Sequence, residues 1–98
     1  MNRLDYIRQE MPAEELWAQL GEEATELAHA AQKMRRIIDG RNPSPVTHVE
    51  AKDKVFEELA DVLLCLQVLR IDLQHPALEK TIDIKLGRWV KRLEEAEK

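Results

Sequence analysis

The sequence predicts an all-α domain, a helical bundle of three main helices plus a short N-terminal helix, completed by oligomerisation. Apolar residues recur every three or four positions over three long segments, which is typical of amphipathic helices. Proline occurs only near the starts of these segments or in the stretch between the first two. No stretch shows the alternation of a β-strand. The 98 residues are expected to form one domain, residues 1–98.

The first long helix is predicted from Pro12 to about Ile38. Proline suits a first helical turn, and Gly40 is a typical residue just beyond a helix end. A short N-terminal segment is expected to pack across the start of this helix through Leu4, Ile7 and Met11. The apolar stripe of the first long helix is predicted to consist of Leu16, Leu20, Leu27, Ala31, Met34 and Ile38.

The second long helix is predicted to begin after a loop, "DGRNPSPV" (39–46). Thr47 followed by Glu50 resembles a capping box. The helix is expected to continue to Leu73, and it is apolar on nearly all sides. Because three helices can hardly surround it, a partner subunit is the expected cover.

The third long helix is predicted to start at His75-Pro76. Its stripe is expected to contain Leu78, Ile82, Leu86, Trp89 and Leu93.

Composition excludes several classes of function. A net charge of −4 argues against binding to a nucleic-acid polymer, which normally requires a basic face. No segment approaches the roughly 18 continuous apolar residues of a membrane span, and no signal peptide is visible, so a cytoplasmic protein is expected. The lone Cys65 is interpreted as a small buried hydrophobe. The three histidines show no metal-ligand spacing and are expected at the surface.

Several charged residues occupy positions that the helical repeat assigns to the core. Glu23 falls inside the first apolar stripe, with Glu26 at its edge and Glu22 slightly further round. On the second helix, Glu58 and Asp61 repeat the same i, i+3 spacing. Lys54 precedes Glu58 by one turn, and on the third helix Lys85 and Arg88 lie at or beside the stripe. The four carboxylates at 23, 26, 58 and 61 are therefore predicted to point into the bundle.

Four close anions in a helical interior require neutralisation, because burial of an unpaired charge is costly. Lysine and arginine side chains supply part of it. A divalent cation supplies it better, and carboxylates without histidine or cysteine select Mg²⁺, with Mn²⁺ as a possible substitute. The residues themselves therefore predict a divalent-cation site inside a helical bundle.

The acidic segments resemble the motifs of a known family. "EEATE" (22–26) and "EELAD" (57–61) are similar to the EExxE … ExxD signature of the MazG-like all-α nucleoside triphosphate pyrophosphohydrolases. "KLGRW" (85–89) is similar to the KLxR segment that follows in that family. The resemblance extends over roughly residues 16–93, and the long connector resembles that of small phage or prophage members.

The resemblance implies an Mg²⁺-dependent enzyme that cleaves a nucleoside triphosphate between the α- and β-phosphates. It implies that Glu23, Glu26, Glu58 and Asp61 bind the metal, with Glu22 as a further ligand or water-orienting group. Lys85, Arg88 and Lys54 would contact the phosphates. Trp17 and Gln19 precede the acidic motif where related enzymes often contact the nucleoside, although Trp17 also suits the core. A homodimer or a dimer of dimers is implied, with sites near the subunit interface.

Other functions are compatible with the same residues. Within the superfamily, phosphoribosyl-ATP pyrophosphatase of histidine biosynthesis has a similar acidic segment, but the third helix fits MazG-like proteins better. Hydrolases dedicated to dUTP or dCTP are a further alternative. From another class, the chain could be a non-catalytic helical dimerisation module, which is disfavoured because all five acidic positions are present.

Overall fold

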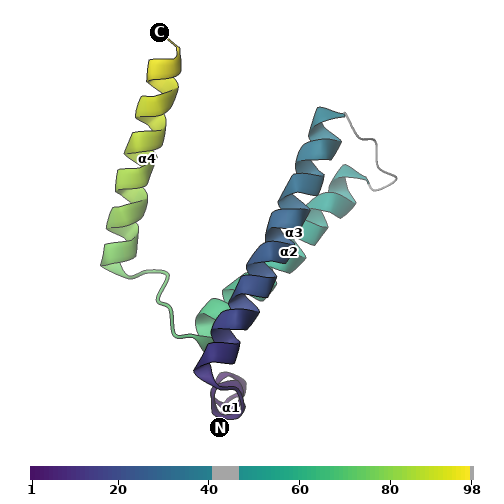
Figure 1. Cartoon of the computed structure of the whole chain (residues 1–98), viewed down its shortest axis with the longest axis vertical. Coiled ribbons are helices and arrows are strands. Elements are labelled where there is room, and N and C mark those ends of the chain that lie inside the picture. Colours follow the sequence, from purple (N-terminus) through teal and green to yellow (C-terminus); the bar gives the residue numbers. More distant parts are fainter. Residues whose placement is uncertain (41–46, 98) are drawn as a thin grey trace.

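The computed structural model describes residues 1–40 and 47–97, which contain four helices and no strand (Figure 1). The all-α prediction is confirmed. Positions 41–46, which hold most of the predicted loop, lie outside the described residues. The helices are α1 (Arg3–Glu10), α2 (Ala13–Asp39), α3 (His48–Val68) and α4 (Pro76–Ala96).

Side-chain caps set the starts of three helices. The Asn2 side chain accepts a hydrogen bond from the backbone N–H of Asp5, and the Thr47 hydroxyl accepts one from that of Glu50. At the start of α4, His75 Nδ1 accepts from the N–H of Ala77. These contacts satisfy backbone donors that have no partner within the helix. The predicted starts of the second and third long helices are therefore confirmed.

Helices α2 and α3 run antiparallel and form the main packed unit of the chain (Figure 1). Their less exposed residues follow a 3–4 repeat, which places them along a common seam. On α2 the seam residues are Leu16, Leu20, Glu23, Leu27, Ala30, Met34 and Ile37. On α3 they are Ala51, Val55, Glu58, Val62 and Cys65, and Leu69 continues the series just past the helix end. A glutamate lies in the middle of each series.

The structure differs from the predicted stripe at two positions of α2. Ala30 is buried and Ile37 half-buried, whereas the predicted Ala31 and Ile38 are exposed. A straight helix drifts by about 20° per heptad relative to a strict seven-residue repeat. Over the length of α2 this drift accumulates, so that Ala30 and Ile37 face α3 in place of the predicted Ala31 and Ile38.

Helix α3 ends at Val68, five residues before the predicted Leu73. Arg70 adopts a left-handed conformation with φ 62°. The N–H of Arg70 donates to Gln67 O, and the N–H of Ile71 donates to Leu66 O. This pair of bonds is a Schellman motif, which terminates a helix and usually places glycine at the left-handed position.

Replacing Arg70 with glycine is expected to raise the free energy of unfolding by about 1 kcal/mol, because glycine adopts positive φ without steric cost. The Arg70 side chain is largely exposed, and its nearest contact to Asp5 is 4.0 Å, so its removal costs little. Urea denaturation checks the change. Arg70→Ala is the control, since it removes the same side chain but keeps the Cβ. Equal effects of the two substitutions on the free energy of unfolding would show that the left-handed conformation of Arg70 does not limit stability.

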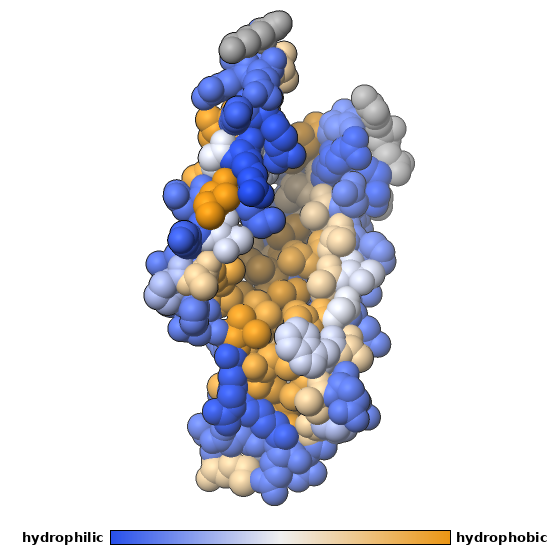
Figure 2. All heavy atoms as spheres, turned by 60° about the vertical axis from the view of Figure 1, so that its left-hand side comes forward, coloured by the Kyte–Doolittle hydropathy of each residue, from blue (hydrophilic) through white to orange (hydrophobic). Residues whose placement is uncertain are grey.

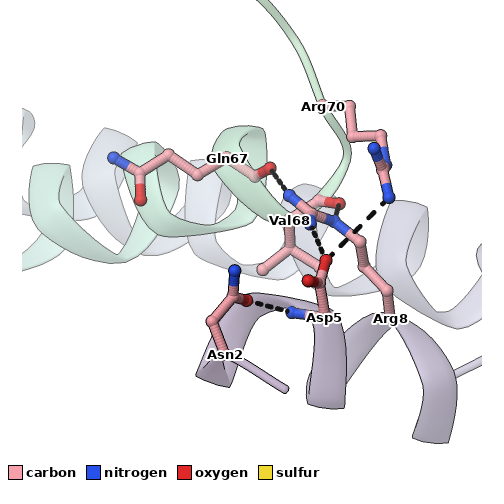
Figure 3. A network of polar contacts seen from close by, with 6 residues as sticks. All are labelled: Asn2, Asp5, Arg8, Gln67, Val68 and Arg70. Atoms are coloured by element: carbon pink, nitrogen blue, oxygen red, sulfur yellow. Dashed lines mark hydrogen bonds and ion pairs between the residues drawn. The ribbon is translucent and has the colours of Figure 1, made fainter.

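Arg8 of α1 makes the hydrogen bonds that join this helix to the end of α3 (Figure 3). Arg8 Nε donates to Val68 O and Arg8 Nη2 donates to Gln67 O, both at 2.8 Å. Arg8 Nη1 also contacts Asp5 Oδ1 at 2.7 Å. Helix α3 has no basic residue in its own last turn, so Arg8 supplies the positive charge that favours a helix C-terminus.

Helix α4 stands apart from the α2–α3 hairpin (Figure 1). The residues of its predicted stripe are mostly exposed, including Ile82, Leu86, Trp89 and Leu93 at 55–61%. None of the described helices is long and apolar enough to cross a membrane. The sequence correctly predicts the helix, but within one chain its stripe lacks a packing partner among the described residues.

Candidate metal centre

Three carboxylates from two helices meet in the α2–α3 seam. Glu23 of α2 and Glu58 and Asp61 of α3 each place one carboxylate oxygen within 4.8 Å of the others. Glu58 is 6% exposed, and Glu23 and Asp61 are partly exposed. The 3–4 repeat explains the arrangement, because Glu23 and Glu58 occupy seam positions that otherwise hold apolar residues.

One cation partly neutralises the cluster. Lys54 Nζ lies 2.9 Å from Glu58 Oε1, one helical turn away, and 3.6 Å from the exposed Glu57. The hydrogen bond to Glu58, with the negative charges of both glutamates, raises the pKa of Lys54. Lys54 therefore stays protonated and offsets one of the three negative charges, leaving Glu23 and Asp61 without a cationic partner in any contact that the structure describes.

Glu23 is the carboxylate most affected by the crowding. Partial burial raises the pKa of Glu23, and the nearby charges of Asp61 and Glu58 raise it further. A hydrogen bond from Gln19 Nε2 to Glu23 Oε1, 2.8 Å long, acts in the opposite direction and orients the carboxylate. The family resemblance implied that Gln19 contacts the nucleoside. The structure places Gln19 beside the acidic cluster.

The raised pKa of Glu23 predicts how stability depends on pH in metal-free protein. Protonated Glu23 is favoured in the folded state, so its contribution is fully present below the ordinary glutamate pKa. This contribution is lost as pH rises through the raised pKa. With EDTA present, Glu23→Gln is therefore expected to melt higher than wild type near neutral pH, with a smaller difference in acid. Thermal melts of both proteins across this pH range check the prediction, and a pH-independent difference would contradict it.

A cavity of about 230 Å³ adjoins the cluster. Its walls come from three helices and combine apolar side chains with the polar edge of the site. They include Ile7 and Met11 near the end of α1, Gln19 and Glu23 of α2, and Asp61 and Cys65 of α3. The cavity therefore places an apolar wall directly beside two of the carboxylates.

Cys65 lies at this cavity and is only half-buried, rather than the buried core residue that was predicted. Burial and the negative charges of Glu23 and Asp61 raise the pKa of the thiol. The thiol thus stays neutral near pH 7, and nucleophilic chemistry is disfavoured. All three histidines are exposed, as the sequence predicts.

Two predicted acidic site residues, the metal ligand Glu26 and the further ligand or water-orienting group Glu22, do not join the cluster. Glu22 and Glu26 are exposed on α2, and both lie beside Glu23 at a shallow surface depression. Each precedes a seam residue by one position, which turns it about 100° away from α3. The sequence placed Glu26 at the edge of the stripe and predicted that it points into the bundle. In the structure Glu26 is exposed, and its neighbour Leu27 lies in the seam as predicted.

Three further predicted contact residues lie away from the carboxylates. Lys85 and Arg88 are on α4 and line an open depression on that helix. Trp17 is 54% exposed, follows the seam residue Leu16 and does not line the cavity beside the cluster. Within one chain, Trp17 therefore neither packs in the core nor lines the cavity, which were the two roles considered for it.

The contribution of α1 to the site was not predicted. Ile7 and Met11 form part of the cavity wall because Arg8 holds α1 against the end of α3. The apolar spacing of Ile7 and Met11 signalled a packed turn, but no sequence signal connects Arg8 with carbonyl groups sixty residues away.

Comparison of the chain with models of protein families, with curated protein sequences and with solved structures found no match.

Proposed function

We propose that this protein is a Mg²⁺-dependent nucleoside triphosphate pyrophosphohydrolase that cleaves the α–β phosphate bond. The products are a nucleoside monophosphate and pyrophosphate. The observation that carries the proposal is the meeting of Glu23, Glu58 and Asp61 in one packed seam, beside a cavity. The order and spacing of the acidic residues, which resemble the MazG-like signature, support it.

The donor set fits a hard divalent cation. All three groups are carboxylates, which favour Mg²⁺ or Mn²⁺, and the ligand atoms lie within 4.8 Å of one another. Each of the three residues would supply one carboxylate oxygen to the ion. When bound there, the ion neutralises polyphosphate charge and activates water for attack on phosphorus.

The chain's own residues have distinct roles in this proposal. Glu23, Glu58 and Asp61 hold the ion, and Gln19 orients Glu23 through the hydrogen bond between them. Exposed Glu22 and Glu26 lie beside Glu23, where they can bind a second ion or orient water. The cavity receives the nucleoside, and Lys54, which contacts Glu58, stabilises negative charge on the leaving pyrophosphate.

The decisive assay supplies a panel of ribo- and deoxyribonucleoside triphosphates and phosphoribosyl-ATP, with Mg²⁺, and measures pyrophosphate and orthophosphate separately. Pyrophosphate as the primary product is expected. Orthophosphate as the primary product would refute α–β cleavage. Exclusive turnover of phosphoribosyl-ATP would assign the histidine-pathway activity instead.

A non-catalytic dimerisation module is the second candidate, because so much apolar surface is exposed. The two candidates differ in their response to metal. Specific binding to the folded state raises the melting temperature by mass action. A wild-type melting temperature that does not change in millimolar Mg²⁺ or Mn²⁺, together with no turnover, would favour the module.

A further inference from the structure

The buried carboxylate of the acidic cluster is already in contact with a cation. Lys54 Nζ lies 2.9 Å from Glu58 Oε1. The side chain of Glu58 is buried and that of Lys54 is half exposed, so the ammonium group reaches the glutamate from the solvent side. Glu58 is also one of the three residues that could hold a metal ion. The lysine therefore occupies a group that a metal ion would require.

Lys54 is the cation that this chain brings to the cluster. Among the described residues, no ion pair joins another lysine or arginine to Glu23, Glu58 or Asp61. The basic residues of α4 lie on a helix that is separated from the α2–α3 hairpin by a hollow lined with apolar atoms (Figure 2). One positive charge thus faces three carboxylates.

The stability of α3 alone does not explain the pairing of Lys54 with Glu58. In an isolated helix, glutamate followed by lysine four residues later is the more favourable order, and here the order is reversed. Lys54 also lies too far from the C-terminus of α3 to gain from the helix dipole. Its contact with the exposed Glu57 is longer, at 3.6 Å. The charge of Lys54 matters most at Glu58, because an unpaired buried carboxylate is costly.

A divalent cation in the cluster removes the need for this contact. The ion brings two positive charges to three carboxylates, whereas the lysine brings one charge and touches one member of the cluster. If both stayed on Glu58, they would repel each other as like charges in a site with little water. A lysine can leave easily, because its ammonium group is well hydrated and its stem is flexible. The ion is therefore expected to displace Lys54 from Glu58.

We infer that Lys54 is an exchangeable counterion. It neutralises Glu58 in the metal-free protein, leaves when a divalent cation binds, and then contacts the phosphate groups held by that ion. The contact with phosphate rests on the proposed function, whereas the first two steps rest on the carboxylate cluster. The exchange makes metal and phosphate binding mutually favourable, because the ion releases a cation that the phosphate can use.

The first test measures metal affinity without a nucleotide. Lys54→Met removes the competing charge and keeps a long side chain, so Mg²⁺ or Mn²⁺ is expected to bind roughly tenfold more tightly than to wild type in isothermal titration. Lys52→Met is the control and is expected to bind like wild type, because Lys52 is exposed on the same helix and forms no ion pair among the described residues. Equal or weaker binding to Lys54→Met would overturn the exchange.

The second test examines neutralisation of Glu58 in the absence of metal. In EDTA, Lys54→Met is expected to melt below wild type, because the buried Glu58 loses its partner. Adding Glu58→Gln to this variant is expected to restore the melting temperature, since the unpaired charge is then removed. Saturating Mg²⁺ is expected to raise the melting temperature of Lys54→Met more than that of wild type. Equal melting of Lys54→Met and wild type in EDTA would overturn the role of Lys54 as a counterion.

The third test follows Lys54 in the wild-type protein. Formaldehyde with a mild reductant methylates a lysine amine faster when the amine is not held in an ion pair, and mass spectrometry gives the rate at each lysine. Mg²⁺ is expected to speed methylation of Lys54 several-fold relative to EDTA and to leave Lys52 unchanged. Inorganic pyrophosphate, added with excess Mg²⁺, is expected to slow methylation of Lys54 again. Equal rates at Lys54 with and without Mg²⁺ would overturn its release, and a rate that pyrophosphate leaves unchanged would overturn its transfer to phosphate.

Failure of the exchange and failure of the proposed function give different results. Equal Mg²⁺ affinity of wild type and Lys54→Met would refute the exchange and leave a metal-dependent hydrolase standing. The expected behaviour of Lys54 without hydrolysis of any nucleotide would refute the proposed function and leave the exchange standing. No binding of Mg²⁺ or Mn²⁺ to either protein would refute both.

Discussion

Glu58→Gln is expected to lower nucleotide turnover by on the order of 100-fold or more, while the protein stays folded. Glu58 is the buried member of the carboxylate cluster, and glutamine keeps its volume but removes the charge that a cation requires. Isothermal titration with Mg²⁺ or Mn²⁺ is expected to show a matching loss of affinity. Without metal, the variant is expected to melt at the same temperature as wild type or higher, since repulsion from Glu23 and Asp61 is relieved.

Glu57→Gln is the matched control for this substitution. Glu57 is the neighbouring glutamate, is well exposed and also contacts Lys54, but it lies outside the cluster. Its substitution is expected to leave metal affinity and turnover close to wild type. Near-full activity of Glu58→Gln would show that the second acidic segment is not the metal site, and equal losses in both variants would point to the role of Lys54 instead.

The central feature of the site could be predicted because it depends on local periodicity. A glutamate that replaces an apolar residue in a 3–4 repeat must face whatever the helix packs against, and this held for Glu23 and Glu58. The two helix starts at Thr47 and His75 were also predictable, since capping is a local interaction. Asp61 follows from Glu58, because one turn of helix keeps it near the same seam.

The remaining differences arise where sequence spacing does not fix orientation. The choice between Ala30 and Ala31, or between Ile37 and Ile38, depends on how α2 winds against α3, and a difference of 100° separates each pair. The early end of α3 depends on Arg70 adopting a conformation that normally signals glycine. The positions of Lys85 and Arg88 depend on where α4 lies relative to the hairpin, which the helical repeat does not specify. Tertiary contacts decide these cases.

Arg8→Ala is expected to lower the free energy of unfolding by about 2 kcal/mol. The substitution removes two charge-assisted hydrogen bonds to the carbonyl groups that end α3, and the contact with Asp5. Because Asp5 is half exposed, most of the loss is assigned to the two carbonyl contacts. Urea denaturation measures the total, and hydrogen exchange is expected to show the largest loss of protection in α1.

Two further variants test whether the two hydrogen bonds of Arg8 to carbonyl groups, rather than its positive charge alone, stabilise the fold. Arg8→Lys keeps the positive charge near the helix C-terminus but cannot donate to two carbonyl groups in the planar geometry of guanidinium, so it is expected to recover less than half of the loss. Asp5→Asn keeps both carbonyl contacts and is expected to cost under about 1 kcal/mol.

Because α1 carries Ile7 and Met11 into the cavity wall, release of α1 also opens the cavity beside the carboxylates. In Arg8→Ala, nucleotide affinity should therefore fall more than Mg²⁺ affinity, whose ligands lie on α2 and α3. Equal stability of Arg8→Ala and wild type would show that α1 is held by apolar packing alone.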